Sequence, residues 1–177
     1  KMKIAALAGG VGGAKLIDGL SRILNPSDLA VIVNTGDDFN HYGLHISPDL
    51  DTITYTLGGM VNPLTGWGRI EDTNNMLSSL EVLGGQTWFF LGDKDLAVHL
   101  ERTRLMNQGF PLSQVTLKFC GAWGIKQLVL PMTDNNVRTI IDTVENGEIS
   151  FQEYSRSKRQ EEYSCGDLSL SPNLLSC

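Results

Sequence analysis

A glycine-rich stretch near the start of the chain, AGGVGGAKL over residues 8–16, has the composition of a turn that holds an anion. Glycines let the backbone approach a phosphate closely, and the free N–H groups and dipole at the start of the following helix favour negative charge. A lysine placed early in that helix adds a cation within reach. Glycines are also needed for the geometry of an ordinary strand-to-helix turn, which is the alternative. We predict that the anion is held by Gly9, Gly10, Gly12, Gly13 and Lys15.

Two familiar phosphate-loop patterns fit this stretch only in part. The Walker A pattern GxxxxGK[ST] needs a glycine before Lys15 and a hydroxyl after it, but the chain has alanine and Leu16 there. The dinucleotide pattern GxGxxG aligns on Gly10 and Gly12 but meets Lys15 in place of its third glycine. A dehydrogenase that uses NAD is therefore the weakest of the functions considered.

The densest polar chemistry follows the next apolar run, in VNTGDDFNHYGLHISPDLDT over residues 33–52. Its carboxylates are hard oxygen ligands suited to Mg²⁺, which takes one or two carboxylates and completes its shell with waters and substrate phosphates. Clustered carboxylates repel one another unless a cation joins them, although a solvated turn beside a helix start would also contain aspartates. We predict Mg²⁺ as the cofactor, Asp37, Asp38 and Asp49 as its ligands and as the catalytic residues, and substrate contacts from Asn34 and Thr35.

Two histidines lie in the same stretch, with three residues between them. We expect a loop there, so helical ligand spacing does not apply and His41 and His45 are not expected to form a zinc pair. We predict that His45 donates a hydrogen bond to substrate, and a packed loop residue is the alternative. Trp67 and the aromatic residues 88–90 could offer flat surfaces to a ring system, although aromatic residues in strands more often belong to the core.

A third polar group, LGDKDLAVHLERT over residues 91–103, follows another predicted strand. On the helix expected there, Asp95, His99 and Arg102 lie at i, i+4 and i+7 and share one face. A surface ladder of salt bridges and a substrate-facing stripe explain this face equally well. Three polar loops at the carboxyl ends of strands favour a common cleft over three unrelated surface loops.

The apolar spacing predicts the elements that bring these loops together. Residues 3–8 and 29–33 read as buried parallel strands joined by a helix, which makes a βαβ unit. We further expect helices from residue 48 and over residues 72–83, 94–106 and 112–123, strands over 87–91 and 127–130, and a hairpin of 137–143 with 148–154 around Asn146-Gly147. This order predicts an α/β fold with a Rossmann-like, doubly wound, mostly parallel sheet, flanking helices and a C-terminal hairpin.

The totals bound the class of protein. The 177 residues are 41% hydrophobic and 19% charged, which is typical of a globular domain, and the net charge of −6 argues against nucleic-acid binding. Three cysteines form no CxxC pair, and no apolar run approaches the length of a membrane span. We expect a cytoplasmic protein, a homodimer, with no membrane partner. We assign residues 1–154 to one Rossmann-like domain and residues 155–177 to a disordered or divergent tail.

With AGGVGGAKL, VNTGDDFNHYGLHISPDLDT, WFFLGDKDLAVHLERT and LPMTDNNVRT in this order, the chain resembles the CofD family. These are the 2-phospho-L-lactate transferases of coenzyme F-420 biosynthesis, and the resemblance covers residues 2–154. It implies Mg²⁺-dependent transfer of a 2-phospholactyl or enolpyruvyl-phospho group from a guanosine-diphosphate ester to the ribityl hydroxyl of a deazaflavin, FO. GMP is the leaving group.

The resemblance also implies roles for individual residues. The glycine loop would hold phosphates, the three aspartates would hold Mg²⁺ or orient the attacking hydroxyl, and Asp51 with Lys94 would contact the deazaflavin. Phe90, in the same acceptor region, stands where many members carry a polar or basic residue. The family continues well beyond FQEY through a second nucleotide-binding portion. A non-catalytic nucleotide or nucleotide-sugar binding regulator of the CofD-like type is the alternative function.

Overall fold

The centre of the fold is a parallel sheet of three strands. The computed structural model describes residues 2–144, 147–152, 154–155 and 165–170. The strand order is β1 (Ile4–Ala8), β2 (Leu29–Val33), β5 (Leu128–Pro131). Helix α1 (Gly10–Ile23) and a short 3₁₀ turn, η1 (Pro26–Asp28), connect β1 to β2, so the predicted βαβ unit is confirmed.

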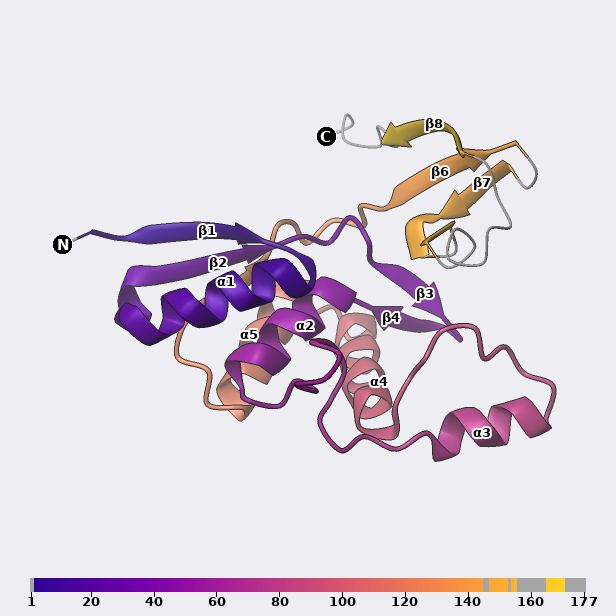
Figure 1. Ribbon diagram of the computed structural model, residues 1–177, viewed down its shortest axis with the longest axis horizontal. Helices are drawn as coiled ribbons and strands as arrows, with labels where there is room; N and C mark the ends of the chain where they lie inside the picture. The colour runs from indigo at the N-terminus through magenta and orange to yellow at the C-terminus, as the bar shows by residue number, and fades with distance from the viewer. Residues whose placement is uncertain (1, 145–146, 153, 156–164, 171–177) are drawn as a thin grey trace.

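Three helices pack on one face of this sheet. They are α1, α2 (Pro48–Leu57) and α5 (Leu112–Ala122), which lie together below the sheet in Figure 1. The core fills the space between sheet and helices because alternate strand residues and one stripe of each helix are apolar. Its buried members include Ala14, Ile17, Leu29, Val31, Val33, Leu50, Ile53, Leu112, Cys120 and Val129.

A two-stranded hairpin lies within the acidic stretch that we predicted to be a loop. Strands β3 (Phe39–His41) and β4 (Leu44–Ile46) pair antiparallel, and α4 (Asp93–Asn107) packs against β4. The hairpin turns at Tyr42 and Gly43, which both have positive φ angles, 52° and 75°. Two such residues in succession match the right-handed twist of paired strands, so the turn is tight.

Residues 87–91 form no strand, so that prediction was wrong. These residues run as a loop whose rings pack on the β3–β4 hairpin. Phe89 meets Phe39 edge to face at 5.0 Å, and the ring of Trp88 lies 5.2 Å from that of His41. Burial by ring packing therefore accounts for the apolar run, without pairing to the sheet.

Helix α3 (Asn75–Val82) is shorter than the predicted 72–83 because Asp72 caps another helix. The Asp72 carboxylate accepts hydrogen bonds from the backbone amides of Lys94 and Asp95, at 2.7 and 3.1 Å, at the start of α4. In return, Asp93 accepts from the amide of Met76 at 3.0 Å in the first turn of α3. Each aspartate thus satisfies free N–H groups of the other helix.

A second, antiparallel sheet has the order β7 (Gly147–Ser150), β6 (Thr139–Thr143), β8 (Cys165–Leu170). The pairing of β6 with β7 confirms the predicted C-terminal hairpin, although Asn146 of its turn lies outside the described residues. Strand β8 falls in the segment that we assigned to a disordered or divergent tail. The rest of that segment, residues 156–164 and 171–177, lies outside the description.

The fold class is the predicted one, a mixed α/β arrangement with a parallel sheet and flanking helices. The helices predicted over 94–106 and 112–123 correspond to α4 and α5, and the strand over 127–130 to β5. Within the described ranges, no helix combines the length and the apolar character that a membrane-spanning segment needs.

Replacement of Ile17 by Ala should test the core directly. Ile17 is fully buried in α1, whereas Ile23 at the end of the same helix is 78% exposed. Because deletion of buried methyl groups leaves a cavity, Ile17→Ala should lower the free energy of unfolding by about 2–5 kcal/mol. The matched Ile23→Ala should change it by no more than about 0.5 kcal/mol. Urea unfolding followed by circular dichroism measures both, and equal effects would contradict the assigned packing.

Candidate functional site

A cavity of about 490 Å³ lies at the carboxyl edge of the parallel sheet, where open α/β sheets bind their ligands. Its lining comes from the beginnings of α1, α2 and α4 and from the aromatic loop before α4. The three polar stretches that we expected to converge do so here. Its polar and aromatic lining includes Gly10, Asp37, Asp49, Asp51, Tyr55, Trp67, Trp88, Phe90, Asp95 and His99.

The glycine turn closes around a carboxylate of the protein itself. The amide of Gly10, which has a φ of +61°, donates to Asp49 Oδ1 at 2.8 Å, and Asn34 Nδ2 donates to Asp49 Oδ2 at 2.9 Å. A side chain at Gly9 would have no room, because a Cβ atom there would lie 2.7 Å from Asp49 Oδ2. The turn thus holds an anion, and that anion is the Asp49 side chain in the first turn of α2.

The other members of the predicted phosphate loop lie apart from this contact. Gly13 allows α1 to approach β1, since a Cβ atom there would meet Ala8 at 3.3 Å, while Gly12 faces open space. Lys15 is exposed on α1 and does not belong to the described lining of the cavity. Only the first two glycines of the motif therefore reach the site in this structure.

Asp37 and Asp49 form a carboxylate pair at the cavity. Asn34 Nδ2, 2.9 Å from Asp49 Oδ2, also lies 3.4 Å from Asp37 Oδ2, so one amide group serves both acids. Burial raises the pKa of Asp37 above its ordinary value, and the charge of Asp49 raises it further. The groups that contact the pair, namely the Asn34 amide, the Gly10 N–H and the Thr139 hydroxyl, are neutral, which is an environment that favours a bound cation.

Asp38 points elsewhere. It is buried, its Oδ2 accepts from the Ser47 hydroxyl at 2.7 Å and lies 3.1 Å from His45 Nε2, and it lines smaller cavities than the one that Asp37 and Asp49 share. Burial raises its pKa despite these contacts. His45 is therefore the partner of a buried carboxylate. Thr35 is also buried, and its hydroxyl has no hydrogen-bond partner among the described residues.

A buried polar network on α2 and α4 forms another part of the cavity wall. Arg102 is 3% exposed and makes two hydrogen bonds to the Asp51 carboxylate, one of them at 3.2 Å. Its Nη1 also lies 3.1 Å from His99 Nδ1, and the Tyr55 hydroxyl donates to Asp95. For the face shared by Asp95, His99 and Arg102 we expected either a surface ladder of salt bridges or a substrate-facing stripe. The structure shows a largely buried face that contacts α2.

Arg102 is the cation of this network. Burial alone would lower its pKa, but Asp51 outweighs that effect and raises it, so the guanidinium stays charged. Burial would raise the pKa of Asp95, yet its contacts with His99 and Tyr55 lower it, so this acid stays ionised too. Burial also raises the pKa of Tyr55, so its hydroxyl keeps the proton that it donates.

Two groups of residues in the described ranges could be considered for a metal ion. Ligand atoms of Asp51, Asp95 and His99 lie within 4.8 Å of one another. However, His99 Nδ1 lies 3.1 Å from Arg102 Nη1, so a positive charge already lies beside this group. Asp51 is already neutralised by the guanidinium. The hard oxygens of Asp37 and Asp49, which have no cationic partner among the described residues, fit Mg²⁺ better.

Exposed aromatic rings form the apolar part of the wall. Phe90 and Trp67 are 49% and 44% exposed, and their rings meet edge to face at 6.2 Å. Of the residues that we expected to contact the acceptor, one lies in the wall and one does not. Asp51 lies in the wall but is bonded to Arg102, while Lys94 lies outside the described lining with its Nζ donating to the carbonyl of Ile70 at 3.1 Å.

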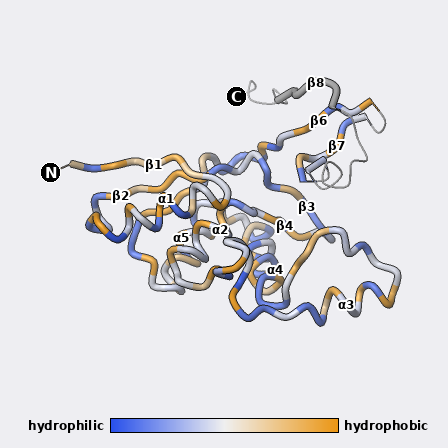
Figure 2. Tube along the Cα trace, in the orientation of Figure 1, coloured by the Kyte–Doolittle hydropathy of each residue, from blue (hydrophilic) through white to orange (hydrophobic). Residues whose placement is uncertain are grey.

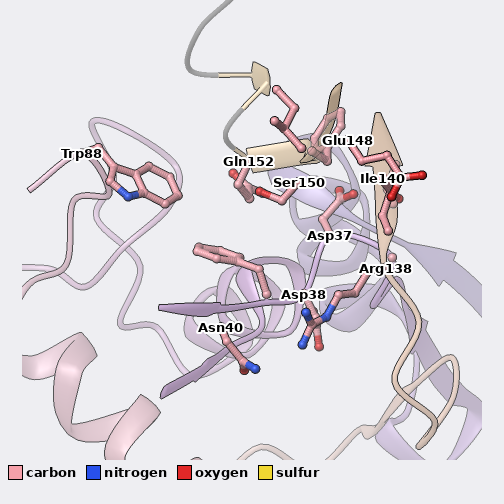
Figure 3. A pocket seen from close by; sticks show the side chains of 14 residues that line it. Asp37, Asp38, Asn40, Trp88, Arg138, Ile140, Glu148, Ser150 and Gln152 are labelled. Carbon is pink, nitrogen blue, oxygen red and sulfur yellow. The ribbon is translucent and has the colours of Figure 1, made fainter. Parts of the chain in front are cut away.

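A smaller neighbouring cavity, about 280 Å³, lies between the acidic stretch and the β6–β7 hairpin (Figure 3). Asp37 and Trp88 line both cavities. Sequence reasoning missed the hairpin's part in this wall, because Asn146-Gly147 predicted the turn but gave no sign of where the hairpin would pack. The polar lining of this smaller cavity includes Arg138, Thr139, Glu148, Ser150 and Gln152.

The sequence model of one family, described as 2-phospho-L-lactate transferase CofD, matches residues 4–173. A phosphoenolpyruvate transferase of Streptomyces coelicolor is 45% identical over 157 residues, which cover 86% of this chain and 49% of that relative. One from Mycobacterium tuberculosis is 41% identical over 172 residues, covering 86% of this chain and 52% of that relative. The chain thus spans about half the length of these curated relatives.

Solved structures agree on the fold. Protein BH3568 from Bacillus halodurans superposes with a TM-score of 0.57 at 16% identity, covering 98% of this chain and 52% of that chain. A second structure of the same protein, described as a member of the UPF0052 family, gives a TM-score of 0.57 at 17% identity, with 97% and 52% covered. At such identity the likeness concerns the fold alone.

A methyl group at Gly9 should disturb the site, and one at Gly12 should not. Gly9→Ala would force the Asp49 carboxylate away from the Gly10 amide and Asn34, with an expected loss of about 1–3 kcal/mol in the free energy of unfolding. Gly12→Ala, in open space on the same helix, should be neutral or stabilising by up to about 1 kcal/mol. Urea unfolding compares them, and equal effects would argue against the carboxylate cradle.

The buried ion pair provides a second test of the site. Arg102→Met leaves Asp51 buried without its cation and should cost about 3–5 kcal/mol in the free energy of unfolding, whereas Arg102→Met with Asp51→Leu should recover most of it. The control is Arg104→Met, two residues along α4 in an exposed pair with Glu101, where stability should barely change. If Arg102→Met were as mild as the control, the network would not stabilise the fold.

Proposed function

The chain belongs to the CofD family of 2-phospho-L-lactate transferases, and we propose that it carries the corresponding activity in coenzyme F-420 biosynthesis. In this proposal a 2-phospholactyl or enolpyruvyl-phospho group moves from a guanosine-diphosphate-activated donor to the ribityl hydroxyl of FO, and GMP leaves. The family model is described as a 2-phospho-L-lactate transferase and the relatives as phosphoenolpyruvate transferases, so the proposal includes both donor acids.

One observation carries the proposal. The glycine turn, the carboxylate pair and the exposed aromatic rings line a single cavity at the carboxyl edge of the sheet. Phosphoryl transfer depends mainly on positioning and on neutralisation of phosphate charge, and the polar part of this wall has groups for both. The aromatic part offers flat apolar surfaces to a ring system such as a deazaflavin.

Asp37 and Asp49 are the residues that would hold Mg²⁺. A bound magnesium ion would supply positive charge that neutralises the phosphates during transfer. The Gly10 amide and Asn34 would then act on the ligand rather than on the phosphate, because both donate to Asp49 and fix the direction of its carboxylate. Such hydrogen bonds commonly orient the ligands of metal sites.

The buried network would orient the acceptor part of the site. Arg102 holds Asp51, and Tyr55 holds Asp95, so both carboxylates are fixed in the wall before any substrate arrives. Preorganised acceptors of this kind suit the hydroxyl and N–H donors of a polar ring system. Lys94 could join them only after its side chain leaves the Ile70 carbonyl, and Phe90 contributes a ring rather than a polar contact.

The full chain should be mixed with FO, the guanosine-diphosphate-activated donor and Mg²⁺, and the phospho-acid adduct sought by mass spectrometry. Asn34→Ala should reduce adduct formation roughly 10–100-fold, as is typical when an orienting partner is lost, and Asp49→Asn should reduce it at least as much. Asp18→Asn is the control, because Asp18 pairs with Arg22 on the surface of α1.

Calorimetric titration with Mg²⁺ alone measures magnesium binding separately from adduct formation. Asp49→Asn should weaken magnesium binding, while Asp18→Asn should leave it unchanged. Undiminished adduct formation by Asp49→Asn would contradict the assignment of Asp49 as a magnesium ligand. Binding of FO and nucleotide without any adduct would instead favour the non-catalytic regulator.

A further inference from the structure

The walls of the two neighbouring cavities contain many acids and few cations. Within the part of the chain that the structure describes, Arg138 is the one lysine or arginine that lines either cavity. Arg102 is buried and bonded to Asp51, and Lys94 donates to the Ile70 carbonyl. Neither of these two side chains belongs to the described linings. Arg138 is therefore the positive charge that these walls present to an anionic ligand.

The guanidinium of Arg138 is fixed at one nitrogen and open at the other two. Its Nε donates to Asn136 Oδ1 at 3.1 Å, which orients the plane of the group. Glu148 lines the same smaller cavity, yet no acid among the described residues forms an ion pair with Arg138. The two Nη groups are thus available, and such a planar fork matches the two oxygens of a carboxylate.

The backbone connects Arg138 to the carboxylate pair. The amide of the next residue, Thr139, donates to the Gly36 carbonyl at 2.6 Å, and the Thr139 hydroxyl contacts the Asp37 carboxylate. Figure 3 shows the Arg138 side chain extending from the start of β6 towards the acidic stretch. Figure 2 shows the segment that connects β5 to β6 as mostly hydrophilic. The cation is thereby held in the cavity that begins at Asp37.

The donor of the proposed function carries two kinds of negative charge. Mg²⁺ at Asp37 and Asp49 would neutralise its phosphates, but the acid part also has a carboxylate, on the carbon that bears the phosphate oxygen. This carboxylate must therefore lie close to the metal. Asp37 lines both cavities, so a phosphate bound at the pair leads into the smaller one, whose volume of about 280 Å³ has room for a three-carbon acid.

We propose that Arg138 binds the carboxylate of the donor acid and that the smaller cavity is the acid subsite. Arg138 is then a specificity-determining residue, because it distinguishes a phospho-acid from a phosphate ester that lacks the carboxylate. Its role differs from that of Asp37 and Asp49, which act on the phosphate through the metal. The inference rests on the proposed function, since that function supplies the donor.

Binding of two small probes tests the proposal without any transfer step. The probe 2-phospho-L-lactate has the carboxylate, and isopropyl phosphate has a methyl group in its place. Each is titrated calorimetrically into the full chain in excess Mg²⁺, and the ratio of the two dissociation constants measures carboxylate recognition. The variants are Arg138→Gln and Arg138→Lys, with Arg104→Gln as the control in an exposed pair with Glu101. Arg138 is itself exposed, so neither substitution should disturb the fold.

The unmodified chain should bind 2-phospho-L-lactate about 10–100-fold more tightly than isopropyl phosphate, because hydrogen bonds to charged groups are strong. Arg138→Gln should bring the ratio close to one by weakening the phospho-acid alone. Arg138→Lys should keep an intermediate ratio, since a point charge remains but the fork is lost. Arg104→Gln should keep the full ratio.

Two results would overturn the proposal: a ratio near one in the unmodified chain, or a ratio that Arg138→Gln leaves unchanged. The adduct assay is a separate measurement. Adduct formation together with an unchanged ratio would contradict the role of Arg138 and leave the proposed function intact. A ratio that depends on Arg138, without any adduct, would support the acid subsite and contradict the transfer activity.

Discussion

The contact between Asp49 and the glycine turn holds the candidate site together. Through one carboxylate, the beginning of α2 is tied to the beginning of α1 by the Gly10 amide and to the end of β2 by Asn34. Three segments separated in the sequence are thereby fixed at one edge of the sheet. Without that contact, the first glycines would lose their partner and Asp37 would lose the neighbour that makes it half of a pair.

Arg102 has the same importance for the rest of the wall. As the guanidinium that holds Asp51, it places a positive charge inside the wall, and that charge adds to the contacts of His99 and Tyr55 that lower the pKa of Asp95. The exposed pair of Arg104 and Glu101 on the same helix has no such consequence, because water already solvates both charges. The site therefore combines a carboxylate pair without a cationic partner among the described residues and a network whose carboxylates have a buried guanidinium beside them.

The sequence predicted the elements that follow from periodicity, and missed features that depend on tertiary contacts. The βαβ unit, α4 and α5 follow from apolar spacing. The third polar loop reaches the site although residues 87–91 form no strand, so its convergence does not follow from strand order. The β3–β4 hairpin was not predicted because its turn uses Tyr42, a residue type that rarely adopts a positive φ. Residues 87–91 resembled a strand because rings that pack on a hairpin are as apolar as buried strand residues. Composition showed a glycine turn suited to an anion, but only the packing of α2 shows that Asp49 occupies it.

Asp37, Trp88, Phe151 and Gln152 line both neighbouring cavities and form a common partition between them. A molecule bound on one side of a shared wall restricts the positions that this wall can adopt, and so changes the affinity on the other side. Such heterotropic coupling is reciprocal: whichever molecule enters first would set the binding strength of the second. A reaction that joins two substrates could then obtain an order of addition from this shared wall, without any movement of the sheet or its helices.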